Sequence, residues 1–89
     1  MALELSTTKE NFTALLTKLG EDLAGDIRFE VRPDLPTVLD WRDSSGALMM
    51  ASLTIYRDRP LLILYKGQDI APHFLDWEFA RDMGVVREA

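Results

Sequence analysis

Apolar and polar positions follow one another in blocks along this chain, and the clearest block lies at residues 47–67. Two apolar runs, residues 47–56 and 61–65, flank a polar break of sequence RDRP at residues 57–60. Short apolar runs separated by a few polar residues are typical of the two strands of a β-hairpin. We therefore predict that this hairpin is the centre of a small sheet.

The two strands of this hairpin differ in how they use their faces. In residues 47–56 one alternating set is uniformly apolar and is predicted to face the core: Met49, Ala51, Leu53 and Ile55. The opposite set leaves Leu48, Met50 and Tyr56 available for another contact. Residues 61–65 are apolar on both faces, so we expect this strand to be central, to have a helix on each face, or to contact a partner chain.

Helical periodicity is clearest near the N-terminus. Apolar residues recur there at spacings of three and four positions, which places them on one face of a helix. These residues are Phe12, Leu15, Leu16, Leu19 and Leu23. The preceding sequence TTKE at residues 7–10 fits a capping box, in which a threonine and a glutamate satisfy the first amides of a helix. Gly20 and Gly25 are both candidate stops, and we favour Gly25 because Leu23 keeps the phase of the stripe.

Two further strands are marked by strict alternation of apolar and polar residues, at residues 26–32 and 37–42. Pro33 and Pro36 break the chain between them, since each proline fixes φ and removes a backbone donor. The sequence DSSG at residues 43–46 has the composition of a short hairpin loop. These segments extend the central hairpin to a four-stranded meander.

The last predicted element is a helix over residues 71–83, with Pro72 near its start and Gly84 as its stop. Steps of 100° per residue give this helix two apolar stripes separated by charged residues. The stripes are Ile70, Phe74 and Trp77 on one side, and Leu75, Phe79 and Met83 on the other. Because one stripe is enough to face the sheet, the other is available to pack on the N-terminal helix or on a partner.

The predicted architecture is a single α+β domain over residues 1–89 with the order α-β-β-β-β-α. It is a two-layer domain in which a four-stranded antiparallel meander is flanked by an N-terminal and a C-terminal helix. Both helices are placed on one face of the sheet, and the alternative places them on opposite faces. This element order resembles that of bacterial secretion chaperones, although the chain is shorter than that group and the resemblance includes no motif.

Composition narrows the class of protein. The 89 residues are 47% apolar and 28% charged, which is ordinary for a globular domain, and they include no cysteine. The lack of cysteine excludes disulfides and thiolate ligands and suits a reducing compartment. No apolar run approaches the about 18 residues of a membrane span, and the N-terminus does not resemble a signal peptide. We therefore expect a cytoplasmic protein that does not enter a membrane.

Candidate chemistry is sparse. His73 is the only histidine, and no serine lies in a nucleophile-elbow sequence, so neither a zinc site nor a catalytic triad is indicated. The sequence therefore predicts no enzyme, no cofactor and no metal. An enzyme subunit whose site is shared across a dimer interface remains an alternative, with Asp40, His73 and Tyr56 as its polar residues.

Function is therefore sought in surfaces. We predict a non-enzymatic protein-interaction module, such as an inhibitor, an antitoxin or immunity protein, or a phage-type host-blocking protein, that binds through apolar and acidic surface. The candidate partner-binding residues are Ile70, Phe74, Trp77, Leu48, Met50 and Tyr56. A homodimer, including a small chaperone-like dimer, is the alternative.

Nucleic acid is an improbable partner on this sequence. The net charge is −5, whereas binding to a phosphate backbone requires clustered basic residues. A local basic patch is the one feature in its favour, and its candidate members are Arg28, Arg32, Arg42, Arg57 and Arg59.

Overall fold

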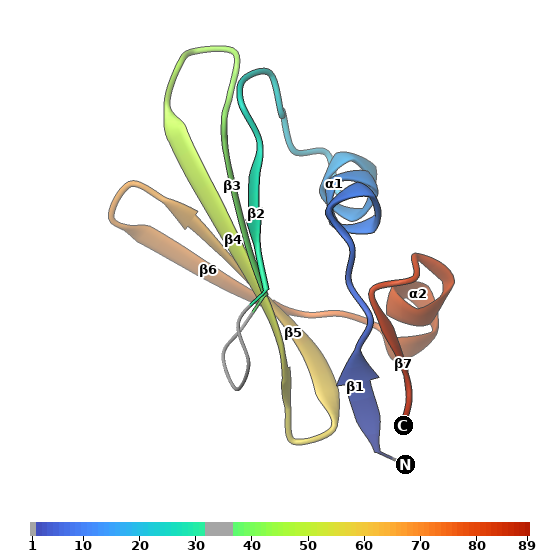
Figure 1. The fold of residues 1–89 in the computed structure, drawn as a ribbon. Coiled ribbons are helices and arrows are strands. Elements are labelled where there is room, and N and C mark those ends of the chain that lie inside the picture. The colour runs from blue at the N-terminus through green and yellow to red at the C-terminus, as the bar shows by residue number, and fades with distance from the viewer. Residues whose placement is uncertain (1, 32–36) are drawn as a thin grey trace.

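The computed structural model describes residues 2–31 and 37–89 (Figure 1). The elements in chain order are β1 (Leu3–Leu5), α1 (Lys9–Lys18), β2 (Arg28–Glu30), β3 (Thr37–Arg42), β4 (Leu48–Tyr56), β5 (Arg59–Lys66), β6 (Asp69–Phe74), α2 (Trp77–Asp82) and β7 (Val86–Glu88). Strands β2 to β6 form an antiparallel meander in chain order, and β1 pairs with β7 in a separate two-stranded sheet. The α+β class and the antiparallel meander are confirmed, but the described residues contain seven strands in two sheets rather than four strands in one.

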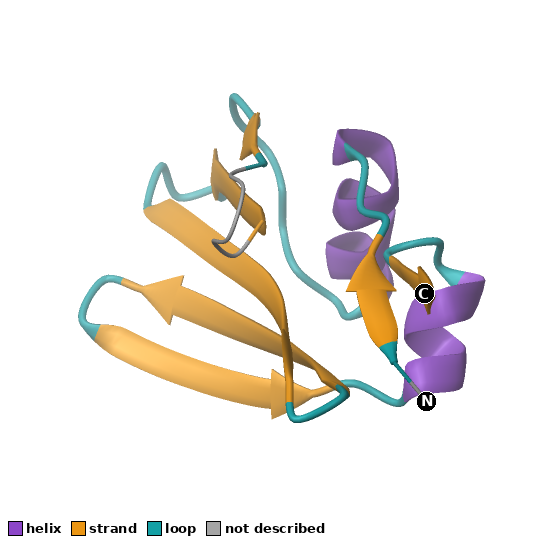
Figure 2. Ribbon diagram, turned by 60° about the horizontal axis from the view of Figure 1, so that its bottom comes forward, coloured by secondary structure: helices purple, strands orange, loops and turns teal. Residues whose placement is uncertain are grey.

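The two helices and the terminal sheet lie on the same side of the five-stranded sheet (Figures 1 and 2). One buried cluster joins both layers. From the terminal layer it contains Phe12, Leu15, Leu16, Ala80, Val85 and Val86, and from the sheet it contains Leu39, Trp41, Met49, Ala51, Leu53, Leu62 and Leu64. The arrangement is therefore two layers, with both helices on one face.

The core-facing side of the sheet follows from strand alternation. Leu39 lies opposite Ala51, and Trp41 lies opposite Met49, and all four side chains are buried. The prediction that Met49 and Ala51 belong to the core-facing set of β4 is confirmed. Large β-compatible side chains at every second position bury one face because successive Cβ atoms point to opposite sides.

Helix α1 is shorter than predicted, and the expected stop at Gly25 is wrong. The helix ends at Lys18 with Leu19 as its C-cap, and Gly20 follows with a φ of +91°. The amides of Ala24 and Gly25 donate to the carbonyl of Arg42 at 2.9 Å, so this segment is tied to the end of β3 and cannot continue the helix. The N-cap is Thr8, whose hydroxyl accepts from the amide of Asn11 at 3.1 Å.

The predicted helix over residues 71–83 is wrong in its first half. Gly67 and Gln68 form a two-residue turn with a φ of +63° at the glycine, and the chain returns as β6 beside β5. Helix α2 begins only at Trp77, where Asp76 is the N-cap and its carboxylate accepts from the amide of Phe79 at 3.3 Å. Pro72 therefore lies in an edge strand, one of the few places in a sheet that tolerates proline.

The two ends of the described chain form a structural unit that the sequence analysis did not predict. Leu3 pairs with Glu88, and Leu5 with Val86, in the β1–β7 ladder. The amide of Ser6 also donates to the carbonyl of Val85 at 3.0 Å. Val85 and Val86 are fully buried and belong to the core, whereas the last three residues are exposed.

The turn between β4 and β5 is strained, and this leads to a prediction. Arg57 and Asp58 have φ values of +52° and +58°, the left-handed conformation that a type I′ hairpin turn requires at both central residues. Because glycine adopts this conformation without Cβ strain, Asp58→Gly should raise the free energy of unfolding by about 0.5–1 kcal/mol, measured by urea denaturation. Gln68→Gly is the control, since Gln68 has no positive φ and its replacement should lower stability. A loss of stability in both variants would show that the turn is not strained at Asp58.

Candidate functional site

The side of the five-stranded sheet that points away from the helices is the candidate site. We call it the outer face, and it consists of the even-numbered residues of β2, β3, β4 and β6 and the odd-numbered residues of β5. No helix or strand within residues 2–31 and 37–89 covers it (Figures 1 and 2). One face of the meander thus forms the core, while the other is left open by the described residues.

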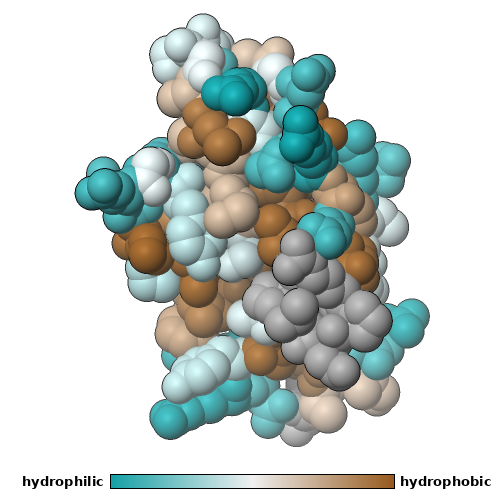
Figure 3. Space-filling view, turned by 60° about the vertical axis from the view of Figure 1, so that its left-hand side comes forward, coloured by the Kyte–Doolittle hydropathy of each residue, from teal (hydrophilic) through white to brown (hydrophobic). Residues whose placement is uncertain are grey.

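Apolar side chains run across the middle of the outer face. One cross-strand row is Met50, Tyr65 and Ile70, and a second places Leu61 beside Phe74. Six large apolar side chains are exposed among the described residues, and four of them lie on this face: Leu48, Tyr56, Ile70 and Phe74. Figure 3 shows apolar side chains through the middle of this side of the molecule, between hydrophilic ones at its margins. Such a grouping is unusual on a free surface, where exposed apolar residues are normally scattered.

Arginines stack on the aromatic rings at the β4–β5 end of the outer face. The guanidinium carbon of Arg59 lies 3.9 Å from the ring centroid of Phe74, and that of Arg57 lies 5.3 Å from the centroid of Tyr56. The two rings are 6.3 Å apart. We call Tyr56, Arg57, Arg59 and Phe74 the arginine–aromatic cluster, in which cation–π contacts hold flexible arginines against rigid rings.

The charges around the apolar rows have a small positive excess. The outer face and its β4–β5 turn contain four arginines, at positions 28, 42, 57 and 59, and three carboxylates, Glu30, Asp40 and Asp58. The whole chain carries −5, so its acidic excess lies elsewhere. The exposed apolar residues therefore lie among more arginines than carboxylates, whereas the sequence associated them with acidic surface.

Five of the six candidate partner-binding residues lie on the outer face: Leu48, Met50, Tyr56, Ile70 and Phe74. Ile70 and Phe74 lie on the same face, as predicted, although they belong to a strand and not to the predicted helix. A spacing of four residues returns to the same face in a strand as well. Trp77 is separate, on the first turn of α2.

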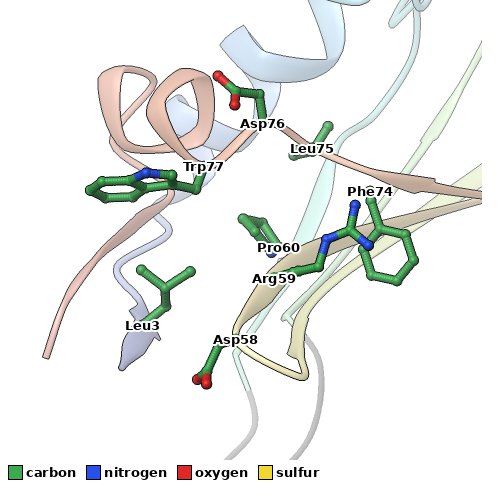
Figure 4. A pocket seen from close by; sticks show the side chains of 8 residues that line it. All are labelled: Leu3, Asp58, Arg59, Pro60, Phe74, Leu75, Asp76 and Trp77. Atoms are coloured by element: carbon green, nitrogen blue, oxygen red, sulfur yellow. The ribbon is translucent and has the colours of Figure 1, made fainter. Parts of the chain in front are cut away.

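Trp77 lines a notch of about 340 Å³ between the terminal layer and the β4–β5 turn. Figure 4 shows Trp77 and Leu3 on one side of it and Arg59 extending to Phe74 on the other. Because Phe74 and Arg59 belong to both the notch and the outer face, the notch opens beside the arginine–aromatic cluster. The Trp77 ring is stacked by Arg81, whose guanidinium carbon is 4.8 Å from the ring centroid.

A second hollow, of about 490 Å³, lies on the core-facing side of the sheet beside α1. Leu19, Leu64 and Leu75 line it, and the ion pair of Glu21 with Lys66, at 3.4 Å, lies at its margin. Its lining is mostly apolar, Glu21 and Lys66 are paired with each other, and His73 is the remaining polar side chain in its lining, so it offers little directed chemistry.

The polar residues considered for catalysis are not brought together within the chain. His73 is at a core-facing position of β6, whereas Asp40 and Tyr56 are on the outer face, near opposite ends of its strands. Asp76 is used as the cap of α2. No cluster of three or more histidine, aspartate or glutamate residues that could hold a metal occurs among the described residues.

The DSSG loop at residues 43–46 is shaped by hydrogen bonds to the carboxylate of Asp43. One carboxylate oxygen of Asp43 accepts from the hydroxyl of Ser45 at 2.6 Å and from the amides of Ser45 and Ala47 at 2.9 Å each. The Ser45 hydroxyl, followed by the Ala47 amide, holds the pKa of Asp43 below its usual value. The carboxylate is thus used to shape the β3–β4 turn.

Comparisons with protein-family models, with curated proteins and with solved structures find no match to this chain. The element order on which the resemblance to secretion chaperones rested is also not the observed one. None of the described helices is both long and apolar enough to span a membrane. Function is therefore inferred from the outer face itself.

Proposed function

We propose that this chain is a non-enzymatic protein-interaction module and that the outer face is its binding surface. The observation that supports this most directly is the open face with Leu48, Tyr56, Ile70 and Phe74 exposed on it. Aromatic and arginine side chains are the residue types that contribute most at protein interfaces, and both are present in the arginine–aromatic cluster.

The face, rather than the edge, of the sheet is the proposed contact. Lys66 and Asp69 flank a two-residue turn and so form a hydrogen-bonded pair, which makes the backbone of Pro72 point away from β5. Proline has no N–H, so the middle of the β6 edge lacks a donor for an added strand. Native sheets use this device against edge-to-edge pairing, so the β6 edge is poorly suited to an added strand, and side-chain contacts on the outer face are the proposed route to a partner.

Such a module acts by occupying the surface of another protein. The classes we propose are inhibitors, antitoxin or immunity proteins, and phage-type host-blocking proteins, with a cytoplasmic location suited to a chain without cysteine. A second copy of the chain is the competing occupant of the same face. Within residues 2–31 and 37–89, no grouping of polar side chains favours an enzyme as a second candidate.

Ile70→Glu tests the proposal, with Val31→Glu as its matched control. The two residues are 63% and 61% exposed and lie near opposite edges of the sheet, but only Ile70 belongs to the outer face. We expect Ile70→Glu to reduce partner capture from the native host at least about tenfold, because a charge would be desolvated in an apolar contact. Val31→Glu should leave capture unchanged.

Quantitative mass spectrometry of the captured proteins measures the effect, and circular dichroism shows that both variants keep the fold. Light scattering over a range of concentrations reports whether the bound species is a second copy. Equal capture by wild type and Ile70→Glu would remove the outer face as the binding surface.

A further inference from the structure

The partner of the outer face is, we propose, a protein segment with carboxylates beside apolar side chains. Its carboxylates bind Arg57 and Arg59, and its apolar side chains pack on the row of Met50, Tyr65 and Ile70. This inference rests on the proposed function and adds the chemistry of the partner to it.

The arginine–aromatic cluster is suited to binding an anion. Among the described residues, no carboxylate forms an ion pair with Arg57 or Arg59, whereas Lys66, Arg81 and Arg87 each have one. Stacking on Phe74 holds the guanidinium of Arg59 in place and leaves the N–H groups at its edge free to donate. A planar guanidinium held in this way suits bidentate contact with a carboxylate, at a lower entropy cost than a free arginine.

The distribution of charge selects an acidic partner. Four arginines and three carboxylates lie on the outer face and its β4–β5 turn, so this region carries a positive excess although the chain as a whole carries −5. A partner with carboxylates around an apolar strip is complementary to this face and is repelled by the rest of the molecule. Complementary charge of this kind sets the orientation and the rate of association.

Nucleic acid fits this face less well. The rings of Tyr56 and Phe74 are each already covered on one side by an arginine, whereas bound bases would stack on open rings. The rest of the apolar row is mostly aliphatic, and Asp40 lies in line with Met50, where it would repel phosphate.

A second copy of the chain also fits less well. A two-fold interface brings the same patch of both copies together, so the arginines would need carboxylates from the same face. The face and its β4–β5 turn offer Asp40 and Glu30 at the β2–β3 side and Asp58 in the turn, and Glu30 already has an interaction partner within its own chain. A two-fold contact would therefore leave arginines in excess of carboxylates.

The test uses three probes and nuclear magnetic resonance of the isotope-labelled chain. The first is an amphipathic peptide with leucine on one helical face and glutamate on the other. The second replaces every glutamate by lysine, and the third is a single-stranded oligothymidylate of similar length. We expect only the glutamate peptide to shift the amide signals of β4, β5 and β6, with an affinity that falls as salt is raised.

Variants identify the residues responsible. The double variant Arg57→Gln/Arg59→Gln should weaken binding of the glutamate peptide by about tenfold or more, since each lost arginine removes a charge-assisted contact. Arg81→Gln is the matched control, because Arg81 also stacks on an aromatic ring but lies on α2. It should bind like the wild type.

The outcomes separate this inference from the function on which it rests. If the lysine peptide binds as well as the glutamate peptide, or if the double variant binds normally, the acidic partner is excluded while the outer face can still be an interaction surface. Preferred binding of the oligothymidylate would assign the face to nucleic acid. Dilution-dependent shifts of the unmixed chain, lost in Ile70→Glu, would assign it to a second copy. No shift with any probe would also overturn the inference.

Discussion

A chain that ends at Gly84 should not fold stably. Val85 and Val86 are fully buried, and each buried valine contributes about 1.5–3 kcal/mol. The carbonyl of Val85 also accepts from the amide of Ser6 and from the hydroxyl of Thr7, at 3.0 and 2.9 Å. Losing these contacts should remove about 5 kcal/mol, which is comparable with the whole stability of a small domain.

Thermal unfolding followed by far-ultraviolet circular dichroism measures this effect. The control is a chain that ends at Val86, which keeps both buried valines and the pairing of Val86 with Leu5. It loses three exposed residues, their pairing with β1, the hydrogen bond from the amide of Ala89 to the carbonyl of Ala2, and the ion pair of Arg87 with Glu4. It should lose about 1–2 kcal/mol, less than the Gly84-terminated chain, because exposed hydrogen bonds and ion pairs stabilise little. A cooperative transition of the Gly84-terminated chain near the wild-type temperature would show that the β1–β7 sheet is dispensable.

Trp41→Ala should lower the free energy of unfolding by about 3–5 kcal/mol. The Trp41 side chain is 1% exposed, lies opposite Met49, and belongs to the single buried cluster. Its indole N–H also donates to the carbonyl of Asp22 at 3.0 Å, which ties the segment after α1 to the sheet. Alanine at position 41 would leave a large cavity and would also release the segment after α1 from the sheet. Urea denaturation followed by circular dichroism measures the loss.

Two variants separate the causes. Trp41→Phe keeps an aromatic ring but removes the hydrogen bond, and it should cost about 1–2 kcal/mol. Trp77→Ala removes the other tryptophan, which is only half-buried on α2, and it should cost less than Trp41→Ala. If the two alanine variants lost the same stability, Trp41 would not be the centre of the core.

The strands with local alternation were predictable. The bounds of β3 match the predicted residues 37–42, and β4 begins one residue later than predicted. The core-facing set of β4 also followed from the sequence, since alternation with period two is a property of the strand itself. Neighbours along the chain were sufficient in these segments because short turns pair them directly.

The segment around β6 could not be decided locally. Ile70 and Phe74 are four positions apart, a spacing that returns to the same face in both a helix and a strand. Pro72 fits the first turn of a helix and an edge strand equally well. The turn at Gly67 folds the chain back onto β5, and pairing with β5 makes this segment a strand.

The terminal strands had no local signature at all. Each contains three residues, and the pairing of Leu5 with Val86 joins positions at opposite ends of the sequence. Only burial against the rest of the core makes such short strands stable. In the same way, Arg59 could be recognised as a charged residue, but its stacking on Phe74 depends on the register of β5 with β6.

The sequence by itself determined the α+β class, the central antiparallel strands and the surplus of apolar residues, because these depend on composition and on spacing within short segments. Tertiary structure alone decided that β1 and β7 close the core, that β6 is a strand, and that the surplus lies on one open face beside Arg57 and Arg59. These features depend on contacts between residues distant in sequence, whose free energy exists only once the chain has folded.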